Sequence, residues 1–264
     1  FGSWGHVAGD GNAASLSESV GGFLVGVDIP VYDWRVGYFG GFSRTDFGVK
    51  ARNSSGNSNN YHLGAYGGTQ WGDLGLRLGA SYSWNGLATD RAVTVGALSN
   101  ELRASYDAGT MQVFGELGQR FALEPFTLEP FANVAYVNLR TGGFSETGGD
   151  AALTARADTM EDTFTTLGVR PSTDISWGSF NATARGMAGW RHAFGDVTPS
   201  STVSFAGSDT FTVSGVPIAR DAGVVEAGMD FTVHGNLSAG ITYGGQFASH
   251  ETDHSIRGNL AIAF

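Results

Sequence analysis

The feature that most constrains this chain is a residue-by-residue alternation of side-chain character over segments of about ten residues. From Trp34 to Ser43, one parity reads Trp, Val, Tyr, Gly and Phe, and the other reads Arg, Gly, Phe, Gly and Ser. Residues 60–71 and 74–85 alternate in the same way. A period of two is typical of strands whose two faces meet different surroundings, and helical spacing does not fit it. The sequence therefore predicts an all-β chain.

The same pattern predicts an even number of strands, twelve in all. They lie near residues 2–9, 19–29, 34–45, 60–71, 74–85, 110–121, 127–139, 163–174, 179–192, 222–233, 236–248 and 255–264. Short turns at 30–33, 72–73 and 234–235 contrast with long polar connections at 46–59, 86–109, 140–162 and 194–221. Structureless loops of that length are uncommon in compact soluble domains, whereas this asymmetry is typical of outer-membrane barrels. We therefore predict one domain, residues 1–264, folded as a twelve-stranded antiparallel up-and-down transmembrane β-barrel.

Apart from Arg44 and Arg140, which lie at strand ends, the charged residues of the predicted strands lie on the parity opposite the more apolar row. They are Asp28, Arg35, Arg77, Glu116, Arg120, Glu129, Arg170, Arg185, Arg191, Glu226, Asp230 and Arg257. An arginine on the lipid-facing side near the bilayer centre costs about 2–4 kcal/mol, so this row cannot meet hydrocarbon. We therefore predict that these charged side chains line the lumen of the barrel.

A soluble β-sandwich or barrel is the alternative, because it also alternates apolar and polar rows. Its charged row would face water and would be rich in lysine and glutamate. Charged residues are only 15% of this chain, and Lys50, in a predicted loop, is its one lysine. Trp34 and Trp71 lie near the short turns, while Trp84 and Trp190 lie near the long connections. We predict that these four residues are interfacial aromatics, in two girdles that flank an apolar band.

Composition and motifs exclude several other functions. The net charge of −10 argues against nucleic-acid binding, and the absence of cysteine rules out disulfides and cysteine metal sites. Residues His250 to His254 match the zinc-protease pattern H-E-x-x-H. That chemistry needs both histidines on one face of a helix, and we expect a polar surface loop here, between the last two strands. We expect no enzyme activity, no cofactor and no metal.

Several segments resemble one family in their order and spacing. They are Trp4-Gly5, Gly21–Asp28, Gly64–Gly67, Phe114–Phe121, Leu128–Tyr136, Gly189–Gly195 and the terminal Phe264. Through these segments, which are spread over the whole chain, the sequence resembles the autotransporter β-domain, the translocator of type Va secretion in Gram-negative bacteria. Gln119 departs from the pattern, since an aromatic residue is usual there.

This resemblance implies an outer-membrane barrel that carries its own N-terminal passenger to the bacterial cell surface. It also implies an α-helical linker that runs through the lumen before the first strand. The chain starts at Phe1 directly with a predicted strand, so we expect the linker helix and the passenger to lie outside these 264 residues. The expected partners are the lipid bilayer of the outer membrane, the passenger and the linker helix.

The closing strand carries a second implication of the resemblance. Ile256, Leu260, Ile262 and Phe264 share one face of the last predicted strand. In the family such a segment resembles the signal that is read by the barrel-assembly machinery, which is therefore a further expected partner. A strand with a free edge can add to a partner sheet through main-chain hydrogen bonds.

Three points remain open from the sequence. The lumen charges could contact a translocating chain, or they could pair among themselves, and we favour pairing because polar groups in a wet interior are paired or hydrated. The barrel could instead be a diffusion porin for small solutes. A third possibility is an enzyme whose active site lies in the long loops.

Overall fold

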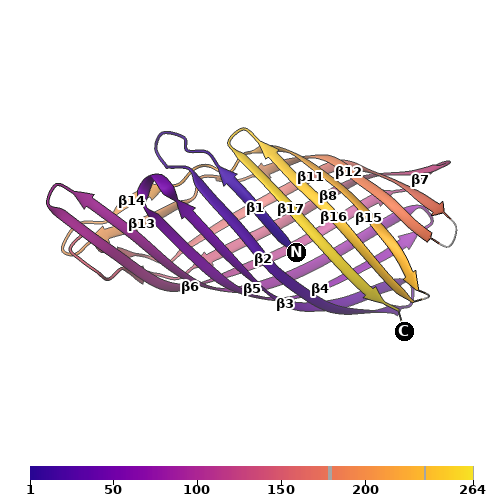
Figure 1. Cartoon of the computed structure of the whole chain (residues 1–264), viewed down its shortest axis with the longest axis horizontal. Coiled ribbons are helices and arrows are strands. Elements are labelled where there is room, and N and C mark those ends of the chain that lie inside the picture. Colours follow the sequence, from indigo (N-terminus) through magenta and orange to yellow (C-terminus); the bar gives the residue numbers. More distant parts are fainter. Residues whose placement is uncertain (178–179, 235, 264) are drawn as a thin grey trace.

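A computed structural model describes residues 1–177, 180–234 and 236–263 and shows a closed antiparallel β-barrel whose strands cross the wall obliquely (Figure 1). The strand order is β11-β12-β15-β16-β17-β1-β2-β3-β4-β5-β6-β8, and β8 pairs back onto β11. The sheet has thirteen strands, and setting aside the three-residue β7 leaves the predicted twelve. The predicted fold class is therefore confirmed. Residues 179, 235 and 264, on which predicted elements fall, lie outside the described residues.

The wall strands are β1 (Gly2–Val7), β2 (Leu16–Val31), β3 (Trp34–Val49), β4 (Ser54–Trp71), β5 (Leu74–Val95), β6 (Leu98–Gln119), β8 (Phe126–Thr141), β11 (Asp158–Trp177), β12 (Phe180–Phe194), β15 (Asp221–His234), β16 (Leu237–Ala248) and β17 (Glu251–Ile262). The short elements are the 3-10 helix η1 (Lys50–Arg52) and the strands β7 (Phe121–Leu123), β9 (Phe144–Ser145), β10 (Leu153–Ala155), β13 (Ser200–Phe205) and β14 (Phe211–Ser214). Within the described residues, no helix has the length and apolarity needed to cross a membrane.

Two of the connections that we predicted as long loops are largely strand. The ladder between β5 and β6 runs out to the pair Val95–Leu98, so the predicted loop 86–109 is a hairpin. In the predicted loop 46–59, β3 extends to Val49 and β4 starts at Ser54. These two predictions were wrong because apolar alternation marks only the part of a strand that has one apolar face. Beyond it, polar and small residues occupy both rows among a few apolar side chains such as Leu102 and Ala104, and the backbone ladder continues without that signal.

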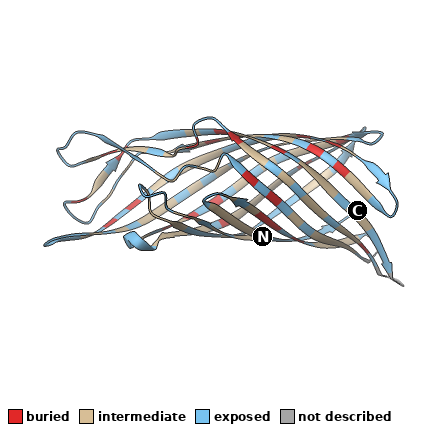
Figure 2. Ribbon diagram, turned by 90° about the horizontal axis from the view of Figure 1, so that it is seen from above, coloured by how far each residue is buried: buried red, intermediate tan, exposed pale blue. Residues whose placement is uncertain are grey.

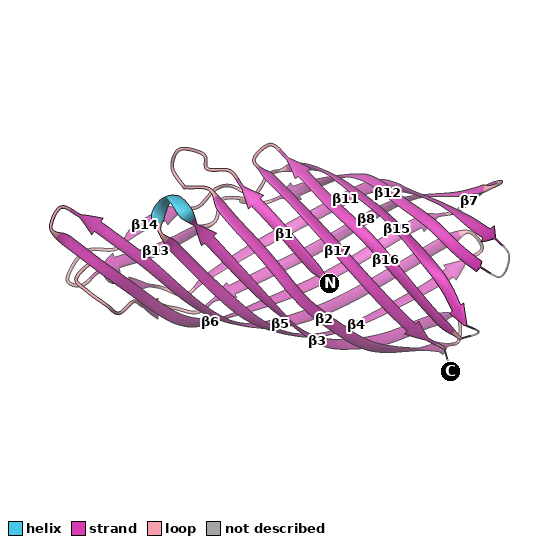
Figure 3. Ribbon diagram, viewed as in Figure 1, coloured by secondary structure: helices cyan, strands magenta, loops and turns pink. Residues whose placement is uncertain are grey.

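The other two long connections form a separate small sheet at the same end of the molecule (Figure 3). Its strand order is β14-β13-β10-β9. A β-bridge between Arg103 and Thr147 and a salt bridge between Arg91 and Glu146 join it to the long hairpin of β5 and β6. The side chain of Glu146 is only 7% exposed, so this ion pair anchors the small sheet to the barrel wall. The prediction that these connections lack structure was therefore also wrong.

A loop between β1 and β2 lies at this same end. The backbone N–H groups of Ala13 and Asn12 donate to the Asp10 carboxylate at 2.8 and 2.9 Å and hold its pKa below the usual value. The side chain of Asn12 donates in turn to the carbonyl oxygen of Ser214 at 3.0 Å. These contacts tie the first loop to the small sheet.

Along each wall strand, exposed residues alternate with less exposed ones (Figure 2). The outward row is apolar and open to its surroundings: Tyr38 is 64% exposed, Leu63 54% and Val134 52%. Buried residues of the wall include Glu116 and Glu129, at 8% and 7% exposure. A soluble domain has the opposite arrangement, because it rarely exposes a contiguous apolar patch of more than a few hundred Å². The outer surface is therefore built to face lipid.

Two glycines let strands β2 and β3 approach closely on the lumen side. A Cβ added at Gly22 would overlap the carbonyl oxygen of Phe42 and would lie 2.6 Å from the Cβ of Ser43. A Cβ added at Gly41 would overlap the carbonyl oxygen of Phe23 in the same way. Glycine in a strand interior permits such a close approach of two backbones.

We expect Gly22→Ala to lower the free energy of unfolding by about 1–3 kcal/mol, because the overlap is with backbone that must shift. Gly21→Ala is the matched control, since a Cβ at Gly21 meets nothing within 4 Å. That control should be neutral or stabilising by less than about 1 kcal/mol. Urea unfolding of both variants in lipid vesicles measures the difference, and equal midpoints for the two would refute the close approach.

Candidate functional site

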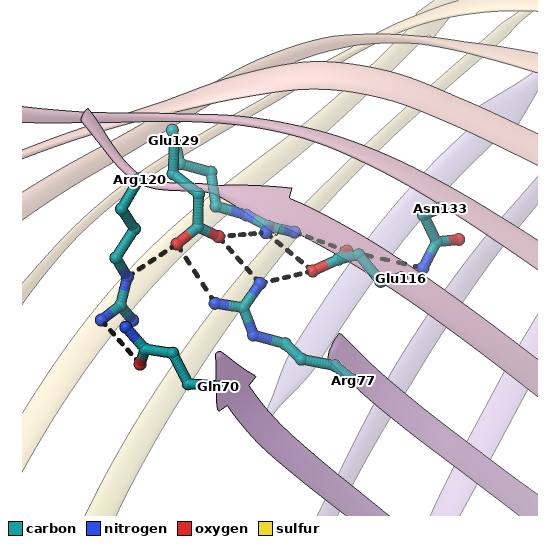
Figure 4. A network of polar contacts seen from close by, with 7 residues as sticks. Gln70, Arg77, Glu116, Arg120, Glu129 and Asn133 are labelled. Atoms are coloured by element: carbon teal, nitrogen blue, oxygen red, sulfur yellow. Dashed lines mark hydrogen bonds and ion pairs between the residues drawn. The ribbon is translucent and has the colours of Figure 1, made fainter. Parts of the chain in front are cut away.

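Carboxylates and arginines form a connected network of polar contacts, which we call the arginine–glutamate network (Figure 4). It consists of Gln70, Arg77, Glu116, Arg120, Glu129, Asn133 and Arg170. Two glutamates hold it together. Glu116 contacts Arg77 at 2.8 Å and Arg170 at 2.7 Å. Glu129 contacts three arginines: Arg77 at 2.8 Å, Arg120 at 3.0 Å and Arg170 at 3.2 Å.

These contacts place the network on the concave side of the wall. Arg77 on β5 reaches Glu129 on β8, although β6 lies between these strands, and Arg170 on β11 reaches Glu116 on β6 across β8. Strands two apart in a sheet are separated by about 10 Å. Side chains converge across that distance inside a barrel and diverge outside it. The network therefore lies in the lumen.

Burial is unequal between the two charge types of the network. The side chains of Glu116 and Glu129 are each 9% exposed, whereas those of Arg77 and Arg170 are 39% and 32% exposed. The carboxylates are thus almost enclosed by arginines, and each guanidinium keeps one side toward the lumen. The guanidinium of Arg170 also lies over the ring of Phe131, 3.7 Å from its centroid. Such cation–π contacts fix the plane of the arginine.

The remaining predicted lumen charges form separate pairs. Arg185 binds Asp230 at 2.9 Å, and Arg257 binds Glu226. Near the short turns, Asp28 pairs with Arg35 and accepts a hydrogen bond from Tyr66 Oη at 3.0 Å. Each of the eleven residues Asp28, Arg35, Arg77, Glu116, Arg120, Glu129, Arg170, Arg185, Glu226, Asp230 and Arg257 thus has an ion-pair partner within the same set.

The lumen charge Arg191 differs from the others. It donates to Gln246 Oε1 at 2.6 Å and to Thr166 Oγ1 at 3.4 Å, and these are neutral partners. Gln246 Nε2 donates onward to Glu251 at 2.8 Å, so a neutral amide links this arginine to an acidic residue.

Open space remains beside these groups. A cavity of about 360 Å³ lies between the arginine–glutamate network and the wall of β12, β15 and β16, where Arg185, Glu226 and Thr242 line it. A second cavity of about 710 Å³ lies toward the short turns, lined by Tyr66, Phe114 and neighbouring residues. The network therefore occupies one side of the lumen without filling it.

Sequence reasoning missed the large aromatic side chains that point into the lumen. Phe39, Tyr66, Phe114 and Phe131 lie on the polar parity, and each sits directly opposite a glycine of a neighbouring strand. Those glycines are Gly64, Gly37, Gly79 and Gly168, and a Cβ at any of them would collide with the facing ring. These aromatic residues can be recognised only from their pairing with a glycine on the neighbouring strand, and that pairing requires knowledge of the register between strands. Gln70 and Asn133 were missed because nothing in a neutral polar row marks them.

The four predicted interfacial aromatics lie on the outward row. Trp71, Trp84 and Trp190 are 53%, 51% and 47% exposed, and Trp34 is intermediate. Trp34 and Trp71 lie next to the short turns, and Trp84 stands opposite Tyr61 at the level where the long hairpins begin to leave the barrel. Trp190 donates to Asp221 Oδ1 at 2.9 Å. Their anchoring role in the bilayer surface stays a prediction.

Four of the five residues of the zinc-protease pattern lie in a strand rather than in the predicted loop, because β17 starts at Glu251, directly after His250. In an extended strand, positions four apart are about 13 Å apart, which is too far for two ligands of one metal ion. His254 instead contacts Tyr243 Oη through Nδ1 at 2.7 Å and stacks on Trp4. His250 Nδ1 contacts Ser249 Oγ at 3.0 Å. The two histidines have separate structural roles.

The predicted assembly residues Ile256, Leu260 and Ile262 lie on the outward row of β17, at 45%, 70% and 59% exposure. Phe264 lies outside the described residues. A row of this kind fits lipid contact in the finished barrel.

Comparisons with known proteins agree with this architecture. The family model described as "Autotransporter beta-domain" matches residues 1–244. An "Extracellular serine protease" of Serratia marcescens is 37% identical over 268 residues, and this chain spans 25% of its length. The translocator domain of the autotransporter NalP from Neisseria meningitidis superposes with a TM-score of 0.79 at 16% identity, over 100% of this chain and 85% of that one. The β-domain of the Bordetella autotransporter BrkA gives a TM-score of 0.68 at 17% identity, over 100% of this chain and 99% of that one.

Proposed function

The chain belongs to the autotransporter β-domain family, and we propose that its barrel is the pore through which an N-terminal passenger of the same protein reaches the bacterial cell surface. It is an outer-membrane translocator barrel of type V secretion. The observation that carries the proposal is the family match over residues 1–244 of a closed barrel with an apolar outer face.

The paired lumen charges support passage of a polypeptide. A chain in transit carries residues of both signs, and unpaired arginines on the wall would hold its carboxylates. In the arginine–glutamate network every arginine is bound to a glutamate, and two carboxylates offset two of the three positive charges, so the field that a passing chain meets is reduced. We propose that these residues stabilise the wall and do not themselves grip the passenger.

We propose that the barrel itself is not an enzyme. The related protein from Serratia marcescens is named an extracellular serine protease, but the matched part is a quarter of its length. Any catalytic activity of the protein that contains this chain would then belong to its passenger. The separation of the two histidines in the H-E-x-x-H segment supports this assignment.

The function is tested by surface display. We expect an epitope-tagged passenger, followed by its natural linker and residues 1–264, to be accessible to antibody on intact Gram-negative cells. A matched chain that lacks β17, and therefore cannot close the barrel, should leave the epitope inside. If the folded barrel reached the outer membrane and formed an ion-conducting channel while the epitope stayed in the periplasm, the chain would be a diffusion porin.

We further propose that the barrel-assembly machinery recognises the apolar row of β17. Deleting Phe264, or replacing Leu260 by Ser, should slow the appearance of the heat-modifiable folded barrel in pulse-labelled cells. Asn259→Ser is the matched control, because Asn259 is the neighbouring residue on the lumen row of the same strand. An unchanged rate for both test variants would contradict this partner.

A further inference from the structure

The arginines on the outward row of the wall differ in whether they have an ion-pair partner. Arg44 contacts Asp46 at 3.3 Å, and Arg103 contacts Asp90 at 2.9 Å. Arg140, near the end of β8, is exposed, and no carboxylate of the described residues forms an ion pair with it. A charged side chain on the lipid-facing side is stable only where its head reaches polar surroundings. Arg140 therefore offers a positive charge that the protein itself leaves unpaired.

Arg140 lies beyond the boundary of the apolar band. It pairs with Gly109 on β6, which in turn pairs with Trp84 on β5. Rows of paired residues rise away from the short turns as they pass from β3 toward β8, because the strands cross the wall obliquely (Figure 1). Trp34, beside one short turn, pairs with Thr69, which lies two residues before β4 ends at the next short turn. Arg140 is thus farther out than Trp84, at the depth of the lipid headgroups.

A glycine brings a second donor to the side of Arg140. A Cβ added at Gly109 would overlap the hydroxyl oxygen of Tyr82, so this hydroxyl lies over the residue that pairs with Arg140. The rings of Tyr82 and Trp84 are in edge contact, with centroids 4.8 Å apart, and this contact holds the phenol in place. In the part of the chain that the structure describes, the Tyr82 hydroxyl has no hydrogen-bond partner. A guanidinium and a free O–H donor therefore lie next to each other on the outer face.

The carboxylates on this part of the outer face are turned elsewhere. Glu161 on β11 accepts a hydrogen bond from Asn138 Nδ2 at 2.8 Å. Asp107 on β6 leans toward β5 and away from β8, since its Oδ1 lies over a glycine of β5. The direct neighbour of Arg140 on β11 is Thr159, which is uncharged. An anion at Arg140 would therefore meet hydrogen-bond donors with no carboxylate directly opposite.

We propose that Arg140, Tyr82 and Trp84 form a binding site for a phosphate monoester carried by a lipid of the outer leaflet. The guanidinium fork matches two phosphate oxygens, and the Tyr82 O–H donates to the third. Trp84, which is 51% exposed, packs against the apolar part of the same lipid. A phosphodiester has only two free oxygens, so it would leave one of these donors unused. The proposal needs a barrel in the outer membrane, and it does not depend on the passage of a passenger.

Binding of a short-chain lipid tests the site. Full-length protein in detergent is titrated with dihexanoyl phosphatidate, a phosphate monoester, and the complexes are counted by native mass spectrometry. We expect one molecule to bind, about tenfold more tightly than dihexanoyl phosphatidylcholine, because one hydrogen bond to a charged group has about that effect. Arg140→Gln should weaken phosphatidate binding by about tenfold or more. Arg44→Gln is the matched control, since it removes the same charge from an outward arginine that is already paired, and it should leave binding unchanged.

Two further variants change the site without changing its charge. Tyr82→Phe removes the hydroxyl, and Gly109→Ala displaces it, so each should weaken phosphatidate binding by about threefold or more while Arg140 is intact. Heat-modifiable mobility shows that each variant folds.

Three results would overturn the proposal. Equal weakening in Arg140→Gln and Arg44→Gln would mean that general charge attraction holds the phosphatidate. Equal affinities for phosphatidate and phosphatidylcholine would mean that the acyl chains alone are bound. Displacement of phosphatidate by an equal concentration of inorganic phosphate would mean that the site takes a free anion and not a lipid.

Discussion

Val113→Arg should destabilise the folded barrel by about 2–4 kcal/mol, which is the expected effect of an arginine on the lipid face near the bilayer centre. Val113 lies on the outward row of β6 and is 44% exposed. On this strand, Gln119 faces Leu74 beside the short turn and Gly109 faces Trp84 at the other boundary. Val113 is therefore close to the middle of the bilayer, where the side chain cannot easily reach a headgroup.

Gln112→Arg is the matched control for this substitution. Gln112 is the preceding residue of the same strand, at nearly the same depth, but it lies on the exposed lumen row. Its replacement should change the free energy of unfolding by less than about 1 kcal/mol, because the new charge stays in water. Urea unfolding in lipid vesicles compares the two variants. Equal losses would mean that the two faces of β6 do not differ, which would contradict the assignment of lipid and lumen sides.

Glu129→Ala should also destabilise the barrel strongly, by about 2–4 kcal/mol. Glu129 neutralises Arg77, Arg120 and Arg170, and its own side chain is 9% exposed. Removing one partner of a buried ion pair typically costs about 3–5 kcal/mol, since it leaves an uncompensated charge. The expected loss is smaller here because the three arginines keep 32% to 48% of their side-chain surface open to the lumen.

Two further variants show whether the network is the cause. Asp28→Asn disrupts a lumen pair whose arginine is 68% exposed, and it should cost less than about 1 kcal/mol. The double variant Glu129→Ala with Arg120→Ala should lose less than the sum of the single losses, because Arg120 has already lost its carboxylate. Strictly additive losses of unfolding free energy would show that Glu129 and Arg120 do not stabilise each other. No loss in Glu129→Ala would show that lumen water replaces the pair completely.

The sequence predicted the membrane-spanning parts of the fold correctly and its outer end poorly. Alternation is visible where one face is apolar, as from Trp34 to Ser43, and there the predicted strands match the structure closely. It is lost in the hairpin of β5 and β6 beyond Trp84, where polar and small residues occupy both rows. In that part, strand formation depends on pairing between the two strands, which no single segment reveals.

For the lumen, the sequence predicted the row but not the partners. The sequence assigned Arg77, Glu129 and Arg170 to the lumen row. It did not show that Glu129 contacts Arg170 and Arg77, which lie 41 and 52 positions away in the chain. Partner identity depends on register, and a shift by two residues preserves every parity while changing every pair. The rings of Phe39 and Phe114 above glycines were invisible for the same reason.

By itself, the sequence determined that this chain is a two-faced β structure, which face is apolar, and therefore that the charges point inward. That much follows because side chains alternate with a period of two, and a lipid face tolerates no buried arginine at its centre. Only the tertiary structure decided which charges neutralise each other and how the small sheet joins the long hairpin of β5 and β6. These depend on the stagger of the twelve strands at closure, which is set by the packing of the whole barrel at once.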